Sequence, residues 1–137
     1  MSEFQIGQKA SVKAVMSDEA VREFARISGD NNPLHLSDAY AEGTRFGKRI
    51  AHGILVSGQI SRVIGTILPG EGTVYLSQSL HFKRPVYVGD TVTAEVEIAA
   101  MDNEKQRMKL KTTVLNEAGE CVLSGEAIVI PPVHGES

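Results

Sequence analysis

The chain has 137 residues, 42% of them hydrophobic, and its 14 basic and 17 acidic residues give a formal net charge of −3. This length suits one compact core and is short for two. The charges form no long run of either sign, so there is no general field to attract nucleic acid or an anionic membrane. We expect neither as a partner, and any anionic ligand must be bound by local contacts.

Cys121 is the only cysteine, which excludes an intramolecular disulfide and a cysteine-rich metal site. The first residues contain no basic patch followed by an apolar run, and the chain has no stretch of roughly 18 consecutive apolar residues. These features predict a cytoplasmic protein. We expect a single domain over residues 1–137, with a loose tail at 131–137.

Two helices are expected in the first half of the chain. The first begins after the N-cap candidate Ser17 and ends at Gly29, with apolar residues at helical spacing between them. The second begins near His52 and Gly53 and runs to about Leu68, where a Pro-Gly pair ends it. Because the second helix is apolar on most sides, we expect it to be buried.

The second predicted helix also carries small residues at strict four-residue spacing, namely Gly53, Ser57, Ser61 and Gly65. This spacing places them along one face. A glycine inside a helix costs about 1 kcal/mol relative to alanine, so we expect close packing or a ligand at this face to compensate.

Downstream the period of the pattern changes to two. Residues 91–100 and 108–114 alternate between polar and apolar types, as strands with one wet and one buried face do. Turn-forming residues at 102–105 and 116–119 separate the runs, which predicts an antiparallel meander. Earlier strands are expected near residues 10–15 and 74–82.

A buried helix encoded before a run of antiparallel strands indicates an α+β domain whose sheet curls around that helix. Such a sheet has edges that need cover. Pairing with a second copy is a common solution, so we expect a homodimer, although a charged and solvated edge gives the same periodicity.

The segment at residues 29–35, Gly-Asp-Asn-Asn-Pro-Leu-His, places an acid and an imidazole five positions apart. Pro33 prevents continuation of a helix and the other residues favour turns, so a non-helical loop is expected to bring Asp30 and His35 together. A carboxylate and a neutral imidazole that share one water can remove its proton and later return one. An Asx-type turn with a surface histidine is the alternative interpretation of this string.

This string resembles the signature of the MaoC-like (R)-specific enoyl-CoA hydratases. Residues 46–53 resemble the family's approach to its central helix, and residues 82–90 resemble a later strand and turn. The resemblance implies a hot-dog fold, in which a curved antiparallel sheet wraps around a long central helix. It is closest to the short, single-hot-dog hydratases that supply (R)-3-hydroxyacyl-CoA for polyhydroxyalkanoate synthesis.

Carried over, the resemblance makes Asp30 and His35 the catalytic pair for syn addition of water to a trans-2-enoyl-CoA. We expect Asp30 to act as the base, with His35 sharing the water and taking part in protonation at the α carbon. The sequence leaves open which of the two takes the first proton. The Gly53 N–H would stabilise charge on the thioester oxygen, although an ordinary helix start with a glycine looks the same.

Two residues around the second helix have two interpretations each. Ser61 matches a serine that the family sets near the acid, where its hydroxyl would orient Asp30, and packing within the stripe of small residues is the alternative. His52 either contributes to substrate binding or packs beside the start of the helix.

Lys48, Arg49, Lys83 and Arg84 are the basic residues nearest the matching blocks. Of these, Lys83 and Arg84 are our candidates for binding the phosphates of CoA, with solvated side chains as the alternative. The histidines lack His-x₃-His spacing, so no metal site is predicted. No cofactor is expected, because CoA is part of the substrate.

Three other functions fit the same resemblance: a 3-hydroxyacyl dehydratase acting on acyl carrier protein, a hot-dog thioesterase, and a non-catalytic acyl-CoA-binding module. A thioesterase attacks the carbonyl carbon rather than the double bond. A binding module has no need of an Asp30 and His35 pair, so the presence of both favours an enzyme, a hydro-lyase.

Overall fold

The computed structural model of the chain describes residues 4–132. Its elements are, in chain order, β1 (Lys9–Val15), α1 (Asp18–Ser28), α2 (Pro33–Leu36), α3 (Asp38–Glu42), α4 (Gly53–Thr66), β2 (Val74–Gln78), β3 (His81–Phe82), β4 (Thr91–Asp102), β5 (Arg107–Leu115) and β6 (Cys121–Ile130). Of the predicted tail, residues 133–137 lie outside the described residues. Within residues 4–132, no helix combines the length and apolar content needed to cross a membrane.

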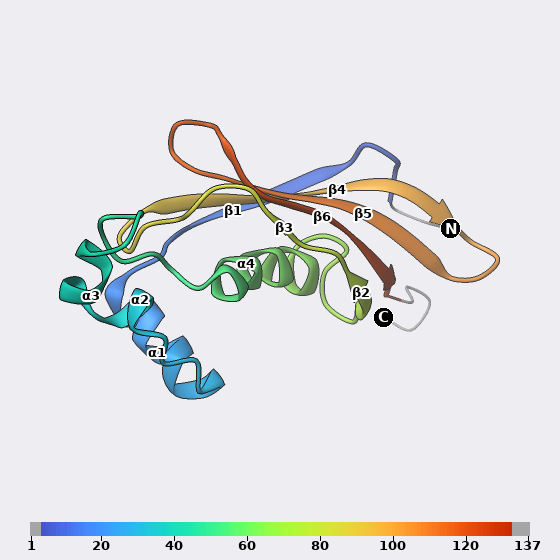
Figure 1. Ribbon diagram of the computed structural model, residues 1–137. Coiled ribbons are helices and arrows are strands. Elements are labelled where there is room, and N and C mark those ends of the chain that lie inside the picture. The colour runs from blue at the N-terminus through green and yellow to red at the C-terminus, as the bar shows by residue number, and fades with distance from the viewer. Residues whose placement is uncertain (1–3, 133–137) are drawn as a thin grey trace.

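The sheet has the order β1-β4-β5-β6-β2, and β3 also pairs with β6. All pairings are antiparallel, so the predicted meander of β4, β5 and β6 is confirmed. Helix α4 lies against one face of this open sheet, and α1, α2 and α3 gather beyond its N-terminal end (Figure 1). This is the hot-dog architecture that the resemblance implied.

The core forms where α4 meets the sheet. Its buried residues include Ile60 and Ile64 of α4 and Val96, Ile98 and Leu110 of β4 and β5. The alternating pattern of the two strands therefore marks the inner face as predicted. Burial of apolar surface of this kind contributes roughly 25 cal/mol per Å², which makes this layer the main source of stability.

Two details of the strands differ from the predictions. Ala100 was expected on the buried face, but the register shifts between Ile98 and Ala100, and Ala100 is exposed. The strand predicted at 74–82 is divided into β2 and β3 around Ser79. A Cβ at Gly125 of the neighbouring β6 would lie 1.8 Å from the Ser79 carbonyl oxygen, so only glycine allows this close crossing.

Helix α4 is buried on one side only. Ile54 and Ile67, expected to be buried, are 55% and 48% exposed. Of the stripe of small residues, Gly53 has a close neighbour, the ring of Phe82, whereas among the described residues nothing lies within 4 Å of a Cβ built at Gly65 or at the nearby Gly58. Within one chain the expected close packing is therefore found at the start of the stripe, and Ser61 and Gly65 are exposed.

Candidate active site

The segment that carries Asp30 and His35 connects α1 to α2. Gly29 ends α1 with a positive φ of 82°, and Asp30 Oδ1 accepts a hydrogen bond of 3.2 Å from the N–H of Asn32. Asn32 then caps α2, and Pro33 occupies the first turn. The prediction of a wholly non-helical segment was wrong at this point, because a proline that blocks a helix interior is favoured at a helix start.

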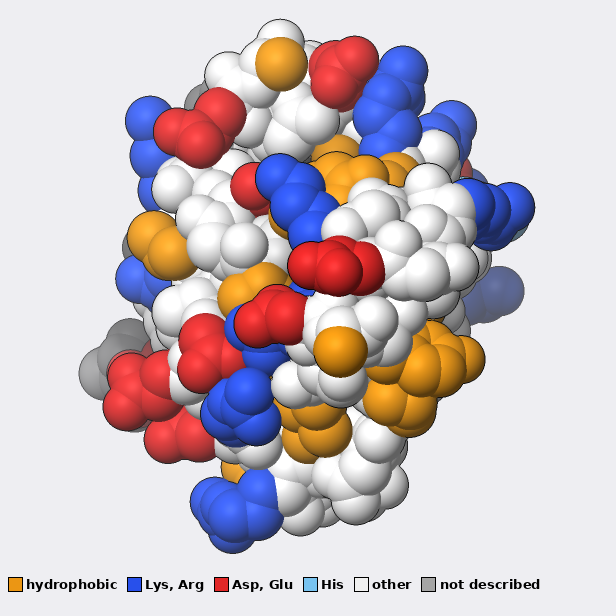
Figure 2. Space-filling view, turned by 60° about the vertical axis from the view of Figure 1, so that its left-hand side comes forward, with side chains coloured by type: hydrophobic (Ala, Val, Ile, Leu, Met, Phe, Trp, Pro, Cys, Tyr) orange, Lys and Arg blue, Asp and Glu red, His pale blue; other side chains and the backbone are white. Residues whose placement is uncertain are grey.

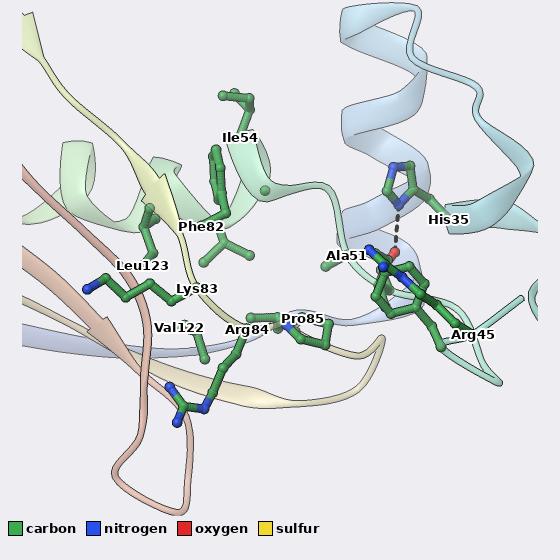
Figure 3. Close-up of a pocket in the computed structure, with 15 residues that line it drawn as sticks. His35, Arg45, Ala51, Ile54, Phe82, Lys83, Arg84, Pro85, Val122 and Leu123 are labelled. Carbon is green, nitrogen blue, oxygen red and sulfur yellow. Dashed lines mark hydrogen bonds between the residues drawn. The ribbon is translucent and has the colours of Figure 1, made fainter.

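His35 is 8% exposed and held by one strong contact. Its Nδ1 lies 2.7 Å from the carbonyl oxygen of Ile50, shown as the dashed line in Figure 3. A carbonyl oxygen only accepts, so Nδ1 carries the proton and Nε2 keeps its lone pair. The contact thus fixes the tautomer in which Nε2 can act as a base or as a hydrogen-bond acceptor.

The carboxylate of Asp30 lies close to this ring. One of its oxygens and a ring nitrogen of His35 are within 4.8 Å of each other, and Asp30 is exposed whereas His35 is buried. Two groups that each form a hydrogen bond of about 2.8 Å to one water lie up to roughly 5.6 Å apart. The spacing therefore suits two groups that share a single water.

His52 packs against this pair from inside the protein. It is 2% exposed, its Nε2 lies 3.1 Å from the backbone carbonyl oxygen of Asp30, and its ring centroid is 3.9 Å from that of His35. Of the three residues only His35 lines the cavity described below; Asp30 and His52 do not. The predicted contact of His52 with substrate stays a prediction.

A cavity of about 410 Å³ opens beside His35. It is lined by the start of α4, the chain around β3 and the first residues of β6: His35, Arg45, Phe46, Ile50, Ala51, Gly53, Ile54, Val56, Phe82, Lys83, Arg84, Pro85, Val86, Val122 and Leu123. The lining is mainly apolar, with few polar groups, as is usual for sites that bind small molecules. Lys83 and Arg84 lie at the opposite end from His35 and Arg45 (Figure 3).

Gly53 is the first residue of α4 and lines the same cavity. Among residues 4–132, its N–H has no acceptor within hydrogen-bond distance, as expected for a helix N-terminus. A Cβ at this position would lie 2.5 Å from Cε1 of Phe82, so the ring of Phe82 occupies the space beside the glycine. The geometry leaves a free donor at the positive end of the α4 dipole.

The basic residues near the cavity have different surroundings. Arg49 is bound to Asp18 at 2.7 Å and Asp38 at 3.1 Å, which ties α1 and α3 together. The hydrogen bond from Arg49 is the main reason that the pKa of Asp18 is lowered, with a second contribution from Arg22. Arg49 is therefore committed to the fold.

Lys83 and Arg84 do line the cavity, and Arg84 also binds the carbonyl oxygen of Cys121 at 3.1 Å. Arg45 was not among our candidates, although it precedes the matching block at 46–53. Only the folded chain brings it to the cavity. Elsewhere, acidic and basic side chains stand next to each other on the face shown in Figure 2, in agreement with the small net charge.

Comparison with known proteins places this geometry in a family. Residues 3–119 match the family described as "MaoC like domain". The chain belongs to the MaoC-like domain family. It is 46% identical over 129 residues to the (R)-specific enoyl-CoA hydratase of Rhodospirillum rubrum, covering 94% of this chain and 89% of that protein.

Two further proteins are similar to the chain over most of its length. A 3-hydroxybutyryl-CoA dehydratase of Methylorubrum extorquens is 44% identical over 135 residues, covering 98% of this chain and 85% of that protein. The solved structure of the (R)-hydratase of A. caviae involved in PHA biosynthesis superposes with a TM-score of 0.94 at 42% identity, covering 96% of this chain and all of that one. This MaoC-like chain thus has the family's fold over nearly its full length.

Ser61 lies eight residues along α4 from Gly53, a rise of about 12 Å, and it is exposed. Within residues 4–132 no hydrogen bond joins its hydroxyl to the Asp30 carboxylate. Its predicted role in orienting Asp30 stays a prediction.

Asp30, His35 and His52 form a group whose potential metal-ligating atoms all lie within 4.8 Å of one another. Backbone carbonyls already occupy Nδ1 of His35 and Nε2 of His52, so each ring has one nitrogen left. The two rings are also stacked, which does not direct both lone pairs at one point. The expectation of no metal site stays a prediction, and metal analysis of the purified protein tests it.

Proposed function

We propose that this MaoC-like chain is an (R)-specific enoyl-CoA hydratase, a hydro-lyase that reversibly converts trans-2-enoyl-CoA into (R)-3-hydroxyacyl-CoA. The observation that carries the proposal is the spacing of at most 4.8 Å between an Asp30 carboxylate oxygen and a ring nitrogen of His35, next to a largely apolar cavity. The names of the close relatives support the same reaction. Its product is a suitable monomer for polyhydroxyalkanoate synthesis.

In the proposed reaction, Asp30 and His35 hold one water against the β carbon of the substrate. As the water oxygen bonds to that carbon, the pair accepts a proton, with Asp30 as the base, and the π electrons move toward the thioester oxygen. The N–H of Gly53 donates to that oxygen and stabilises its negative charge. The α carbon then takes a proton from the pair, so no proton is gained or lost and dehydration follows the same path in reverse.

This chemistry requires no cofactor, because CoA belongs to the substrate. Purified protein freed of metals should therefore keep its activity. Its single cysteine, Cys121, is free in the structure, which suits the reducing cytoplasm that we propose as its location. Fractionation of the cells that produce it, followed by immunoblotting, tests the location.

We propose that Lys83 and Arg84 bind phosphates of CoA. Both residues line the cavity at the end opposite His35, so an acyl thioester placed at His35 extends its carrier toward them. A Lys83→Ala/Arg84→Ala variant should raise KM for crotonyl-CoA about tenfold, because a tenfold change corresponds to the binding free energy of about one hydrogen bond between charged groups. It should leave KM for the phosphate-free N-acetylcysteamine thioester unchanged, and equal effects on both substrates would contradict the assignment.

We further propose that the active form is a homodimer. Strand β2 is an edge strand, and Val74, Tyr75 and Leu76 expose 49%, 40% and 45% of their surface on it. The exposed face of α4, with Ile54 and the small residues, is a second uncovered apolar surface. A second copy that covers both surfaces removes the open edge and brings side chains close to the glycines of α4.

The test is hydration of crotonyl-CoA followed by chiral analysis of the product. We expect the ultraviolet absorbance of the conjugated thioester to fall and (R)-3-hydroxybutyryl-CoA to form. Release of free CoA without hydration would indicate a thioesterase, and binding without conversion would indicate a non-catalytic module. A strong preference for crotonyl-acyl carrier protein over crotonyl-CoA would favour the dehydratase of fatty-acid synthesis, and the (S) product would contradict the proposed stereochemistry.

A further inference from the structure

His52 occupies a position that its side chain does not use in the usual way. It is the N-cap residue of α4, where serine, threonine, aspartate or asparagine normally accept hydrogen bonds from the first N–H groups. The imidazole makes no such bond. Instead it turns into the protein, where it is 2% exposed.

The ring of His52 contacts three residues of α1, α2 and the segment between them, which carries the proposed catalytic pair. Its Nε2 is 3.1 Å from the carbonyl oxygen of Asp30, and its ring centroid is 3.9 Å from that of His35, with the planes tilted by 31°. The ring of Phe24 from α1 packs edge-on with it, with the two centroids 4.7 Å apart. One side chain at the start of α4 thus touches both ends of the 30–35 segment.

We propose that His52 is a positioning residue, which, as a neutral imidazole, holds Asp30 and His35 in their reactive arrangement without touching substrate. The proposal rests on the hydratase function assigned above. It follows from the contacts just described and from the burial of the His52 ring, which is 2% exposed.

The tautomer and charge of His52 follow from the same contacts. A carbonyl oxygen accepts only, so Nε2 carries the proton and donates it to Asp30. Nδ1 is buried and, among residues 4–132, has no hydrogen-bond partner. A second proton there would be a buried charge without an acceptor.

The groups that face His52 are the Asp30 carboxylate and backbone carbonyl, the ring of His35, and Phe24, which has no titratable atom. Burial lowers the pKa of His52 below its usual value, and the hydrogen bond to the Asp30 backbone opposes this effect only in part. A neutral ring is useful here. Because the two ring centroids are 3.9 Å apart, a neutral His52 puts no positive charge beside His35 while the pair accepts the proton of the water.

The contacts can be separated by substitution. His52→Phe keeps an aromatic ring between Phe24 and His35 but removes the donor to Asp30, and it leaves no unpaired nitrogen behind. His52→Gln keeps a donor but removes the stacked ring. His81→Phe is the matched control, because His81 is an exposed histidine on β3 that does not line the cavity.

We expect His52→Phe and His52→Gln to lower kcat for crotonyl-CoA about 10- to 100-fold, with KM within about threefold of wild type, as for other residues that orient a reacting group. Melting temperature and circular dichroism show that the variants fold, and His81→Phe should match wild type. Wild-type kcat in both His52 variants would overturn the proposal. A rise in KM larger than the fall in kcat would mean that His52 contacts substrate.

A second measurement does not depend on activity. Ring ¹⁵N NMR of the wild-type protein should show His52 as the neutral Nε2–H tautomer at pH 7, with a pKa below the ordinary histidine value. A ring that is mainly protonated at pH 7, or the Nδ1–H tautomer, would overturn the proposal even if the hydratase activity is confirmed. If the protein does not hydrate crotonyl-CoA and the NMR result holds, the proposed function fails while the assignment of His52 as a neutral anchor of the segment stands.

Discussion

Two backbone carbonyls determine what the imidazoles near the cavity can do. Ile50 fixes the proton of His35 on Nδ1, and Asp30 fixes that of His52 on Nε2. Each bond selects one tautomer, and for His35 this leaves a lone pair on Nε2. No pattern in the sequence identifies Ile50 as the partner of His35, because the two residues are 15 positions apart and meet only through the fold.

At the same scale, Asp30, His35 and Gly53 could be singled out from the sequence because a recognisable string and a helix start contain them. The inward position of His52 and the presence of Arg45 on the cavity lining could not. Both depend on how the cap formed by α1, α2 and α3 meets the start of α4. Side-chain direction at such a junction is set by packing and not by spacing.

A first prediction concerns Gly53, whose missing side chain leaves room for the ring of Phe82. In Gly53→Ala, the new methyl group would lie 2.5 Å from the Phe82 ring, so the exposed ring must move across the cavity. We expect kcat/KM for crotonyl-CoA to fall by about tenfold, the cost of roughly 1.4 kcal/mol of strain or misplacement. Steady-state kinetics measure the effect.

Gly43→Ala is the control, since its added Cβ meets only the carbonyl oxygen of Tyr40, at an ordinary 3.6 Å. The loss in Gly53→Ala should also be smaller when Phe82 is replaced by alanine, because the clash is then gone. An undiminished loss in that background would show that Phe82 is not the reason why position 53 is a glycine.

Among the elements, the meander of β4 to β6 and helices α1 and α4 were predictable because their periodicity is long and capped by clear signals. The short helix α2 was missed because Pro33 was interpreted as a helix breaker when it begins a helix. The division of the 74–82 strand was missed because it depends on Gly125, a residue of another strand. A local sequence pattern does not show which residues of two different strands will lie in contact.

A second prediction concerns the exposed apolar residues of the edge strand β2. Leu76→Glu places a charge on an exposed apolar edge, and we expect it to convert the homodimer into monomers because a buried carboxylate at the interface is costly. Light scattering coupled to size-exclusion chromatography measures the mass in solution. Ile6→Glu, at a residue that is 64% exposed before β1, is the control and should leave the dimer intact. A wild-type protein with the mass of one chain would contradict the proposed dimer.

For the whole molecule, the order of a buried helix followed by an antiparallel meander led to the correct α+β architecture, and the resemblance supplied its hot-dog form. The sheet is open in one chain, and one face of α4 is uncovered. These surfaces could be anticipated only in general terms, since the pattern of a solvated edge and that of a paired edge are the same. Ser61 is exposed on α4, and its role stays a prediction.

The central claim is that Asp30 and His35 together activate water at the end of the cavity. The most direct test is the rate of crotonyl-CoA hydration by Asp30→Asn and His35→Gln, with circular dichroism and melting temperature as checks of folding. We predict that kcat falls by about 10² to 10⁴ in each variant, the usual share of acid-base catalysis. Near wild-type turnover by either folded variant would contradict the claim.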